Sequence, residues 1–301
     1  MSRVWLRVAG SVAITVVLLM IVPIDRVWAA IRSVSPWVWA GSVVVFVGGH
    51  SLNALKLHLL LGLPVVPAGA CLRAHFAGMA ANLGLPGVAG GDLVRAASLA
   101  SAAGAARITL VAIVDRVVDA AALVLLVAMA APLAGVPPII ADHLRAMAWW
   151  LLAIGVAAAT TIIVVRRWWR QRAGLPRLGE AWASLRDRPG ALGLAVAISL
   201  LVQTAFVLTN IWLAFEVGLP TPIGPWFLAW TGAKLSAVLP ISFGGLGVRE
   251  AALVSILAAY GMAAEGVLAV GILWDGALIV GSLGGFLAMQ LLWREGPVQS
   301  A

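Results

Sequence analysis

Long runs of apolar residues are the feature that most constrains how this chain of 301 residues can fold. A helix of about 20 apolar residues crosses the ~30 Å hydrocarbon core of a bilayer. Only 11% of the residues are charged, whereas soluble domains carry about 25%, so water cannot be the solvent for most of the surface. The runs predict an all-α integral membrane protein with about six full spans, near residues 8–24, 37–55, 107–133, 146–165, 190–215 and 266–292. We interpret the first run as an uncleaved span, because it is longer than the apolar core of a signal peptide.

Two other apolar stretches, residues 72–107 and 223–261, are interrupted by proline and glycine. Proline removes a backbone donor and glycine disfavours helix, so each stretch should divide into two helical arms. Arms of about 15 residues reach roughly 22 Å, which is shorter than the ~30 Å hydrocarbon core. We predict two re-entrant helical hairpins whose breaks lie inside the bundle, where protein or water can satisfy the backbone. The predicted break residues are Pro86, Gly90 and Gly91 in the first hairpin and Pro240, Gly244, Gly245 and Gly247 in the second.

Basic residues are spread unevenly along the chain, whose formal net charge is +8. Cytoplasmic loops of membrane proteins are enriched in Lys and Arg, so this distribution predicts the orientation. With a cytoplasmic amino terminus, 13 basic residues lie inside and three outside. The inner residues are Arg3, Arg7, Lys56, Arg73, Arg107, Arg294 and the seven arginines between residues 166 and 188, and the outer residues are Arg26, Arg32 and Arg145. We expect a multi-pass protein of the cell inner membrane with both termini in the cytoplasm.

The two interrupted stretches are related by an internal repeat. A displacement of 154 residues aligns Pro86 with Pro240 and gives nine identities in 17 positions without a gap. Roughly two identities would arise by chance, so a duplication is the simplest account. The orientation places the first hairpin on the cytoplasmic side and the second on the outer side. We therefore predict two inverted halves, residues 1–145 and 146–301, an arrangement typical of secondary transporters.

Motifs around the breaks also resemble a known family. The motifs are Asn82-x3-Pro86-x3-Gly90-Gly91-Asp92-x2-Arg95, then Asp115-Arg116-x2-Asp119, then Pro240-x3-Gly244-Gly245-x-Gly247-x-Arg249-Glu250. They are similar to the transmembrane, flippase-like region of lysylphosphatidylglycerol synthases, and we expect a stand-alone member without the aminoacyltransferase domain. The resemblance implies a protein that moves a lipid with an anionic or zwitterionic headgroup between leaflets. It also implies, as an alternative, a non-transporting partner of a lipid- or glycolipid-synthesis enzyme.

Charged residues within the apolar stretches are candidates for binding the headgroup, because a charge at membrane depth is costly. Arg95 and Arg249 follow the two breaks, and a guanidinium group matches phosphate oxygens; the alternative is that both form structural ion pairs. Asp115 and Asp119 share one helix face, where they balance the arginines, bind a cationic group, relay protons or hold a divalent ion. The remaining candidates are Asp92, Arg116, Glu250, Asp275 and Lys234, of which the lysine alternatively snorkels to an interface.

Several functional classes are not expected from the sequence. Cys71 is the only cysteine, so no disulfide can form within the chain, and the four histidines show no metal-ligand spacing. No nucleotide-binding glycine motif occurs, and no soluble domain offers a surface for nucleic acid. We therefore expect a lipid transporter and not an enzyme, with no metal, cofactor or nucleic-acid partner. The alternative is a membrane enzyme acting on a polyprenyl-phosphate or phospholipid headgroup, with Asp115 and Asp119 holding Mg²⁺.

Overall fold

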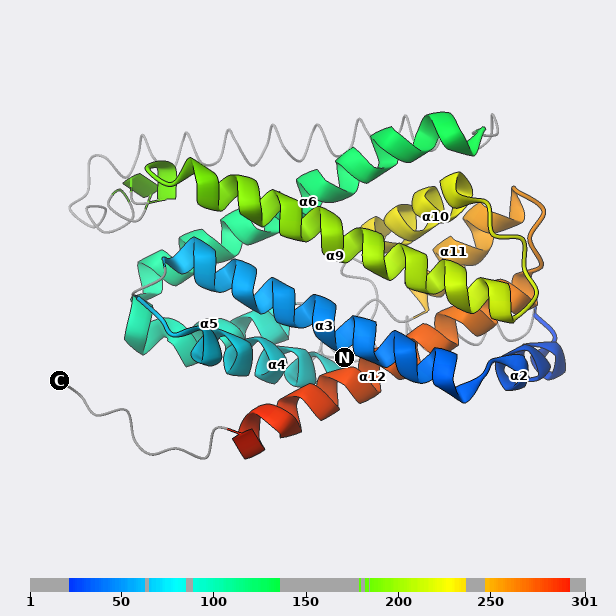
Figure 1. Cartoon of the computed structure of the whole chain (residues 1–301), viewed down its shortest axis with the longest axis horizontal. Coiled ribbons are helices and arrows are strands. Elements are labelled where there is room, and N and C mark those ends of the chain that lie inside the picture. The colour runs from blue at the N-terminus through cyan, green and yellow to red at the C-terminus, as the bar shows by residue number, and fades with distance from the viewer. Residues whose placement is uncertain are drawn as a thin grey trace, which may run out of the picture.

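The structure, a computed structural model, describes residues 22–62, 65–84, 89–135, 179, 182–183, 185–236 and 247–292. Its regular elements there are helices, and no strand occurs within these ranges. In chain order they are α2 (Ile24–Ser33), α3 (Pro36–Leu61), α4 (Ala68–Gly84), α5 (Ala89–Ala103), α6 (Ala105–Ala134), α9 (Pro189–Glu216), α10 (Ile223–Ser236), α11 (Val248–Ala258) and α12 (Ala264–Leu292) (Figure 1). The all-helical fold expected from the sequence is therefore observed.

Four helices, α3, α6, α9 and α12, are long and apolar enough to cross a membrane. They contain 26, 30, 28 and 29 residues, so each is roughly 39–45 Å long and exceeds the ~30 Å hydrocarbon core. The last three match their predicted spans to within two residues at each end. The chain is thus a multi-pass membrane protein. The predicted span at residues 146–165 lies outside the described residues, as does most of the span at 8–24.

Helix α3 is longer than its predicted span, because it continues past residue 55 to Leu61. It begins at Pro36, since the fixed backbone angle of proline suits the first helical position. It ends before Gly62, where φ is 95°, in a region of backbone conformation that favours glycine. The extension carries Lys56 into the bundle, where its side chain is fully buried. The assignment of Lys56 to the cytoplasmic side is therefore wrong.

Both interrupted stretches divide into two helices, as predicted. Residues 72–107 largely form α4 and α5, and residues 223–261 largely form α10 and α11. Gly90 and Gly91 belong to the first turn of α5, so their assignment to the break is wrong. Gly247, with a φ of 81°, does precede the start of α11. The other predicted break residues lie outside the described part of the chain: Pro86, Pro240, Gly244 and Gly245.

Small residues bring α4 and α5 into close contact. A Cβ atom at Gly78 of α4 would lie 2.6 Å from the carbonyl oxygen of Gly91 in α5, which is closer than van der Waals contact allows. Beside them, Oδ1 of Asn82 accepts a 2.6 Å hydrogen bond from the backbone N–H of Gly91. This bond satisfies one of the amide groups that the start of a helix leaves without a partner. The close approach also places Arg95, one turn along α5, against α4.

The order of long, short, short and long helices occurs twice, in α3–α6 and in α9–α12. Helix α4 packs on α12 whereas α10 packs on α6, and α3 packs on α12 whereas α9 packs on α6. Helices α3 and α9 pack against each other. In Figure 1, α3 runs in the opposite direction to α9, and α6 in the opposite direction to α12. These are the contacts and directions that two inverted halves would show.

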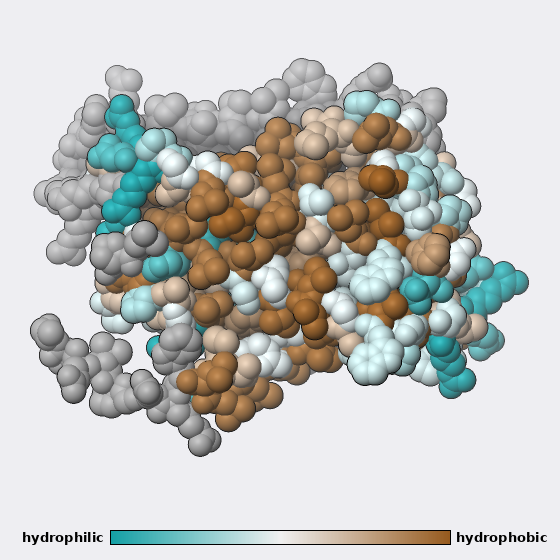
Figure 2. All heavy atoms as spheres, viewed as in Figure 1, coloured by the Kyte–Doolittle hydropathy of each residue, from teal (hydrophilic) through white to brown (hydrophobic). Residues whose placement is uncertain are grey.

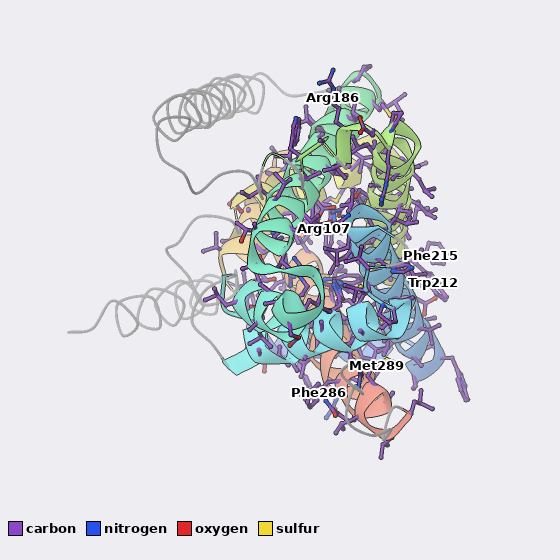
Figure 3. All side chains as sticks on the ribbon, turned by 90° about the vertical axis from the view of Figure 1, so that its left-hand side faces the viewer. Arg107, Arg186, Trp212, Phe215, Phe286 and Met289 are labelled. Atoms are coloured by element: carbon purple, nitrogen blue, oxygen red, sulfur yellow. The ribbon has the colours of Figure 1, made fainter. Side chains whose placement is uncertain are left out.

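Apolar side chains cover much of the outside of the bundle. Figure 2 shows them as a broad belt across the middle of the molecule, with hydrophilic side chains gathered toward both ends of the long axis. In Figure 3, Trp212 and Phe215 of α9 and Phe286 and Met289 of α12 lie on the flanks, and Arg107 lies at the end that faces the viewer. An apolar surface of this extent indicates contact with lipid. The long axis of the bundle therefore lies across the membrane.

Candidate functional site

The interior of the bundle holds a cluster of charged side chains centred on Lys56. Its Nζ atom lies 2.6 Å from Oδ1 of Asp119 and 2.9 Å from Oδ1 of Asp115. It also donates a 3.0 Å hydrogen bond to Oγ of Ser199, which in turn donates one of 2.8 Å to Asp119. Because these residues belong to α3, α6 and α9, three helices meet at one ammonium group. The two carboxylates share one face of α6, as their spacing indicates.

Arg95 extends this first cluster from α6 to α5. Its Nη2 atom lies 3.0 Å from Oδ1 of Asp92 and 3.6 Å from Oδ2 of Asp115. Arg116 pairs with the second carboxylate oxygen of Asp92. With Lys56 and Asp119, the first cluster contains three basic and three acidic side chains, so its formal charge is zero.

A second cluster surrounds Arg249 at the start of α11. The Nη2 atom of Arg249 lies 2.8 Å from Oε1 of Glu250 and also pairs with Oδ1 of Asp275 on α12. Oε2 of Glu250 accepts a 2.6 Å hydrogen bond from the backbone N–H of Gly247, which caps α11. Glu250 therefore fixes both the helix start and the guanidinium group. Arg95 and Arg249 thus form the ion pairs that the sequence offered as the alternative to a free headgroup site.

Lys234 on α10 lies between the two clusters. Its Nζ atom donates a 2.7 Å hydrogen bond to Oε1 of Gln203 on α9, a residue that is only 4% exposed. The ammonium group also lies 5.6 Å from the centroid of the Phe206 ring, within the range of a cation–π contact. It interacts electrostatically with Asp119 of the first cluster and with Arg249 of the second. Lys234 therefore points into the bundle and does not snorkel to an interface.

Two histidines connect the first cluster to an aromatic core. Nη1 of Arg95 lies 3.5 Å from Nδ1 of His75, and Nε2 of His75 lies 3.2 Å from Nδ1 of His50. The His50 ring lies 5.4 Å from the ring of Phe206, measured between centroids. His50 and His75 thus line the polar interior beside Arg95.

Aromatic rings continue from this point to the second cluster. Phe206 packs edge-on against Trp274 at 5.1 Å, and Trp274 packs edge-on against Trp230 at 5.2 Å, both measured between ring centroids. The Arg249 guanidinium lies 6.0 Å from the Trp230 ring. A row of aromatic side chains, Phe206, Trp274 and Trp230, therefore joins the two charged clusters. The Lys234 ammonium lies over the ring of Phe206.

The energetics of this network indicate function more than stability. Burying a charge costs several kcal/mol, and ion pairing often only restores that loss, so apolar residues would stabilise the bundle at least as well. Ionisable side chains inside membrane bundles are by default functional candidates. The network contains five basic and five acidic side chains: Lys56, Arg95, Arg116, Lys234, Arg249, Asp92, Asp115, Asp119, Glu250 and Asp275.

All nine charged residues predicted from the sequence belong to this network, whereas Lys56, Gln203 and Ser199 were missed. Lys56 is followed by an apolar run that ends at Leu61, and this run was the available signal that the span continues. No comparable signal marks Gln203 or Ser199. In the part of the chain that the structure describes, no group of three or more His, Cys, Asp or Glu side chains is placed to hold a metal ion.

Comparison with known proteins supports the resemblance seen in the sequence. A family model described as "Lysylphosphatidylglycerol synthase TM region" matches residues 4–285, which is nearly the whole chain. No curated protein and no solved structure matches. The family match indicates a role related to membrane lipid.

Proposed function

The chain belongs to the lysylphosphatidylglycerol synthase TM region family, and from this premise we propose that it moves a lipid with a charged, phosphate-bearing headgroup between the leaflets of the cell inner membrane. The headgroup is anionic or zwitterionic, and both termini of the protein are cytoplasmic. The activity is transport and involves no covalent change in the lipid.

The observation that carries this proposal is the buried charge network. A headgroup crosses the hydrocarbon core only where polar groups replace its water. The network supplies groups of both signs, so a phosphate can exchange with the carboxylates on Arg95 or Arg249. A cationic group can exchange with Lys56 at Asp119, whose side chain is 25% exposed.

The two-fold packing supports transport over a single reaction centre. Helices α4 and α5 lie toward one end of the long axis in Figure 1, and α10 and α11 lie toward the other. We propose that each pair is a re-entrant hairpin, and that the headgroup reaches the network alternately past one pair and then past the other. A single catalytic centre would not require both helix pairs.

A membrane enzyme that uses Mg²⁺ is the alternative, and the contacts of its predicted ligands disfavour it. Asp115 and Asp119 both contact the Lys56 ammonium, so a cation already occupies the position between their carboxylates. The other alternative, a non-transporting partner of a lipid-synthesis enzyme, predicts no lipid movement by the purified protein.

The experiment is a lipid-translocation assay on the purified chain in vesicles that contain a fluorescent phosphatidylglycerol analogue. We expect movement above that of protein-free vesicles, and we expect Arg95→Gln and Arg249→Gln to remove most of it. Loss of one charge-assisted contact of about 1.5–3 kcal/mol corresponds to a roughly ten- to hundredfold effect. Lysine should restore only part of the activity, because it lacks the bidentate fork.

Arg26→Gln is the control. Arg26 is exposed, and its Nη1 atom lies 3.3 Å from Oε1 of Glu265, which does not belong to the network. It should leave translocation unchanged. If the parental protein moves no lipid, the transport proposal is wrong. If both network variants insert normally and translocate at the parental rate, the arginines have a structural role.

A further inference from the structure

The five basic side chains of the network differ in what neutralises them. Lys56, Arg95, Arg116 and Arg249 each contact at least one carboxylate. Among the described residues, Lys234 contacts instead a neutral amide oxygen of Gln203 and the face of the Phe206 ring. An ammonium group has three donors and no acceptor, and the Gln203 bond uses one of them. Lys234 is therefore the cation of the network whose charge is not matched by a direct anionic partner.

Neighbouring donors on α10 are also unused. Nε1 of Trp230 and Oγ1 of Thr231 are buried and have no hydrogen-bond partner within the described structure. Positions 230, 231 and 234 lie on one side of the helix, because residues three and four apart are neighbours on a helix surface. Buried donors normally find an acceptor. One face of α10 thus presents an ammonium, an indole N–H and a hydroxyl group, all suited to an acceptor that carries negative charge.

We propose that Lys234 is the anchor for a phosphate-type oxyanion, and that this oxyanion replaces Gln203 as the acceptor of the Lys234 ammonium. The inference rests on the proposed lipid transport and names the substrate feature that the site recognises. A phosphodiester has two oxygens that share one negative charge, so one can accept from the ammonium while the other accepts from Trp230 or Thr231. Gln203 keeps the ammonium oriented while the site is empty, and as a neutral acceptor it yields to a charged one.

Lys234 offers the oxyanion a first contact that displaces no carboxylate, ahead of the exchange at the arginines. An oxyanion at Arg95 or Arg249 must displace a carboxylate that already carries the same charge. At Lys234 it displaces an uncharged amide, so no carboxylate has to leave its cation. The Lys234 residue is also partly exposed, whereas Lys56 is fully buried.

The test is binding of phosphatidylglycerol to the purified full chain in neutral detergent, followed by the lipid-dependent shift in thermal unfolding. Lys234→Gln removes the charge and should weaken the apparent affinity roughly ten- to a hundredfold. Gln203→Glu is the sharper variant, because it keeps Lys234 and supplies an internal carboxylate. It should weaken lipid binding to a similar extent while raising the unfolding temperature of the lipid-free protein.

Two further variants control for folding and for net charge. Gln203→Leu removes the neutral acceptor without adding charge, so the affinity should be equal to or higher than that of the parental protein. Arg186→Gln removes a positive charge from an exposed position and should leave the affinity unchanged. Inorganic phosphate, tested at the same concentration as the lipid, distinguishes the sources of the oxyanion. An equal shift assigns the site to a soluble anion, and a shift with phosphatidylglycerol alone assigns it to a headgroup.

The proposal is wrong if Lys234→Gln and Gln203→Glu both bind phosphatidylglycerol as tightly as the parental protein. This result is distinct from failure of the transport proposal. A protein that binds lipid through Lys234 without translocating it would refute transport alone. A protein that translocates lipid while both variants keep full affinity would refute the anchor alone.

Discussion

Lys56 shows how far the role of one residue depends on its surroundings. Its ammonium group lies within 3 Å of two carboxylates, at 2.6 Å from Asp119 and 2.9 Å from Asp115. We expect Lys56→Met to lower the free energy of unfolding by about 3–5 kcal/mol, because buried Asp115 and half-buried Asp119 both lose the ammonium group that they share. Unfolding of the purified protein in detergent, by heat or denaturant, measures the loss.

The companion variant combines Lys56→Met with Asp119→Asn. Removal of one carboxylate should recover part of the lost stability, because contacting charges are coupled. A combined variant no more stable than Lys56→Met alone would show that the carboxylates are not what makes the lysine necessary.

Gly78 offers a second prediction for a single residue. A Cβ atom there would meet the backbone of α5 at 2.6 Å, whereas a Cβ atom at Gly48 on α3 would meet nothing within 4 Å. We expect Gly78→Ala to lower the stability by about 1–3 kcal/mol, through displacement of α5 and with it Arg95. Gly48→Ala should be neutral or stabilising, because alanine is the better helix former. Similar unfolding temperatures for the two variants would contradict the close helix contact.

The candidate residues of the site could be read from the sequence, but their partners could not. A charge in an apolar run is conspicuous, so Arg95, Asp115 and Arg249 were identified without a structure. The contact between Lys56 and Asp119 joins residues 63 positions apart, and no local pattern encodes it. Lys56 itself gives no signal, since a lysine paired in the interior looks the same in the sequence as one in a loop. Only the leucines that follow it, up to Leu61, indicate that the span continues.

At the level of helices, the long apolar elements were predictable and the short amphipathic one was not. The ends of α6, α9 and α12 follow from uninterrupted apolar runs, so they could be located to within two residues. Helix α2 has only ten residues and includes Asp25, Arg26 and Arg32, so no apolar run marks it. Its buried residue, Val27, belongs to an apolar cluster with Leu268 and Ala269 of α12, which only the folded chain provides.

Helix α2 also presents an apolar face to its surroundings. Ile24 and Trp28 are 57% and 53% exposed, and the Arg32 guanidinium lies 4.9 Å from the Trp28 ring. Such a face is typical of a helix that lies in the membrane interface. A cysteine at position 28, in a Cys71→Ala background, should place a polarity-sensitive dye in an apolar environment in lipid nanodiscs. The same dye at exposed Ala29 should report water, and equal emission at the two positions would contradict an interfacial helix.

For the whole molecule, the first prediction concerns orientation. The distribution of basic residues predicts that the segment from 166 to 188 lies in the cytoplasm and that Gly135, at the end of α6, lies on the outer side. Removal of buried Lys56 from the count leaves this asymmetry intact. We expect a cysteine at Gly135 to react with an impermeant maleimide added to intact cells, and one at Ala173 to react only after lysis. The reverse labelling pattern would overturn the orientation.

The second prediction concerns the two halves. Because α4 packs on α12, α10 packs on α6 and α3 packs on α9, neither half can bury its apolar faces alone. Residues 1–145 and 146–301, expressed separately, should each be sensitive to protease in detergent. Expressed together, they should co-purify and resist protease like the intact chain. Stable, separately purified halves would show that the contacts between them contribute little.

Most ion pairs form within one half of the chain, whereas the contacts between the halves are mainly apolar, and this has a consequence for how the protein is synthesised. Lys56, Arg95 and their carboxylates all belong to the stretch from α3 to α6, and Arg249 and its carboxylates to the stretch from α10 to α12. A ribosome delivers the earlier helices to the bilayer before the later ones exist, and each group can pair its basic side chains with carboxylates as it emerges. The contacts between the earlier and the later helices form last, and they are mainly apolar. Until then, lipid tails can cover these apolar surfaces at little cost in free energy. The nascent chain can therefore complete its costliest pairings in the order in which it is made.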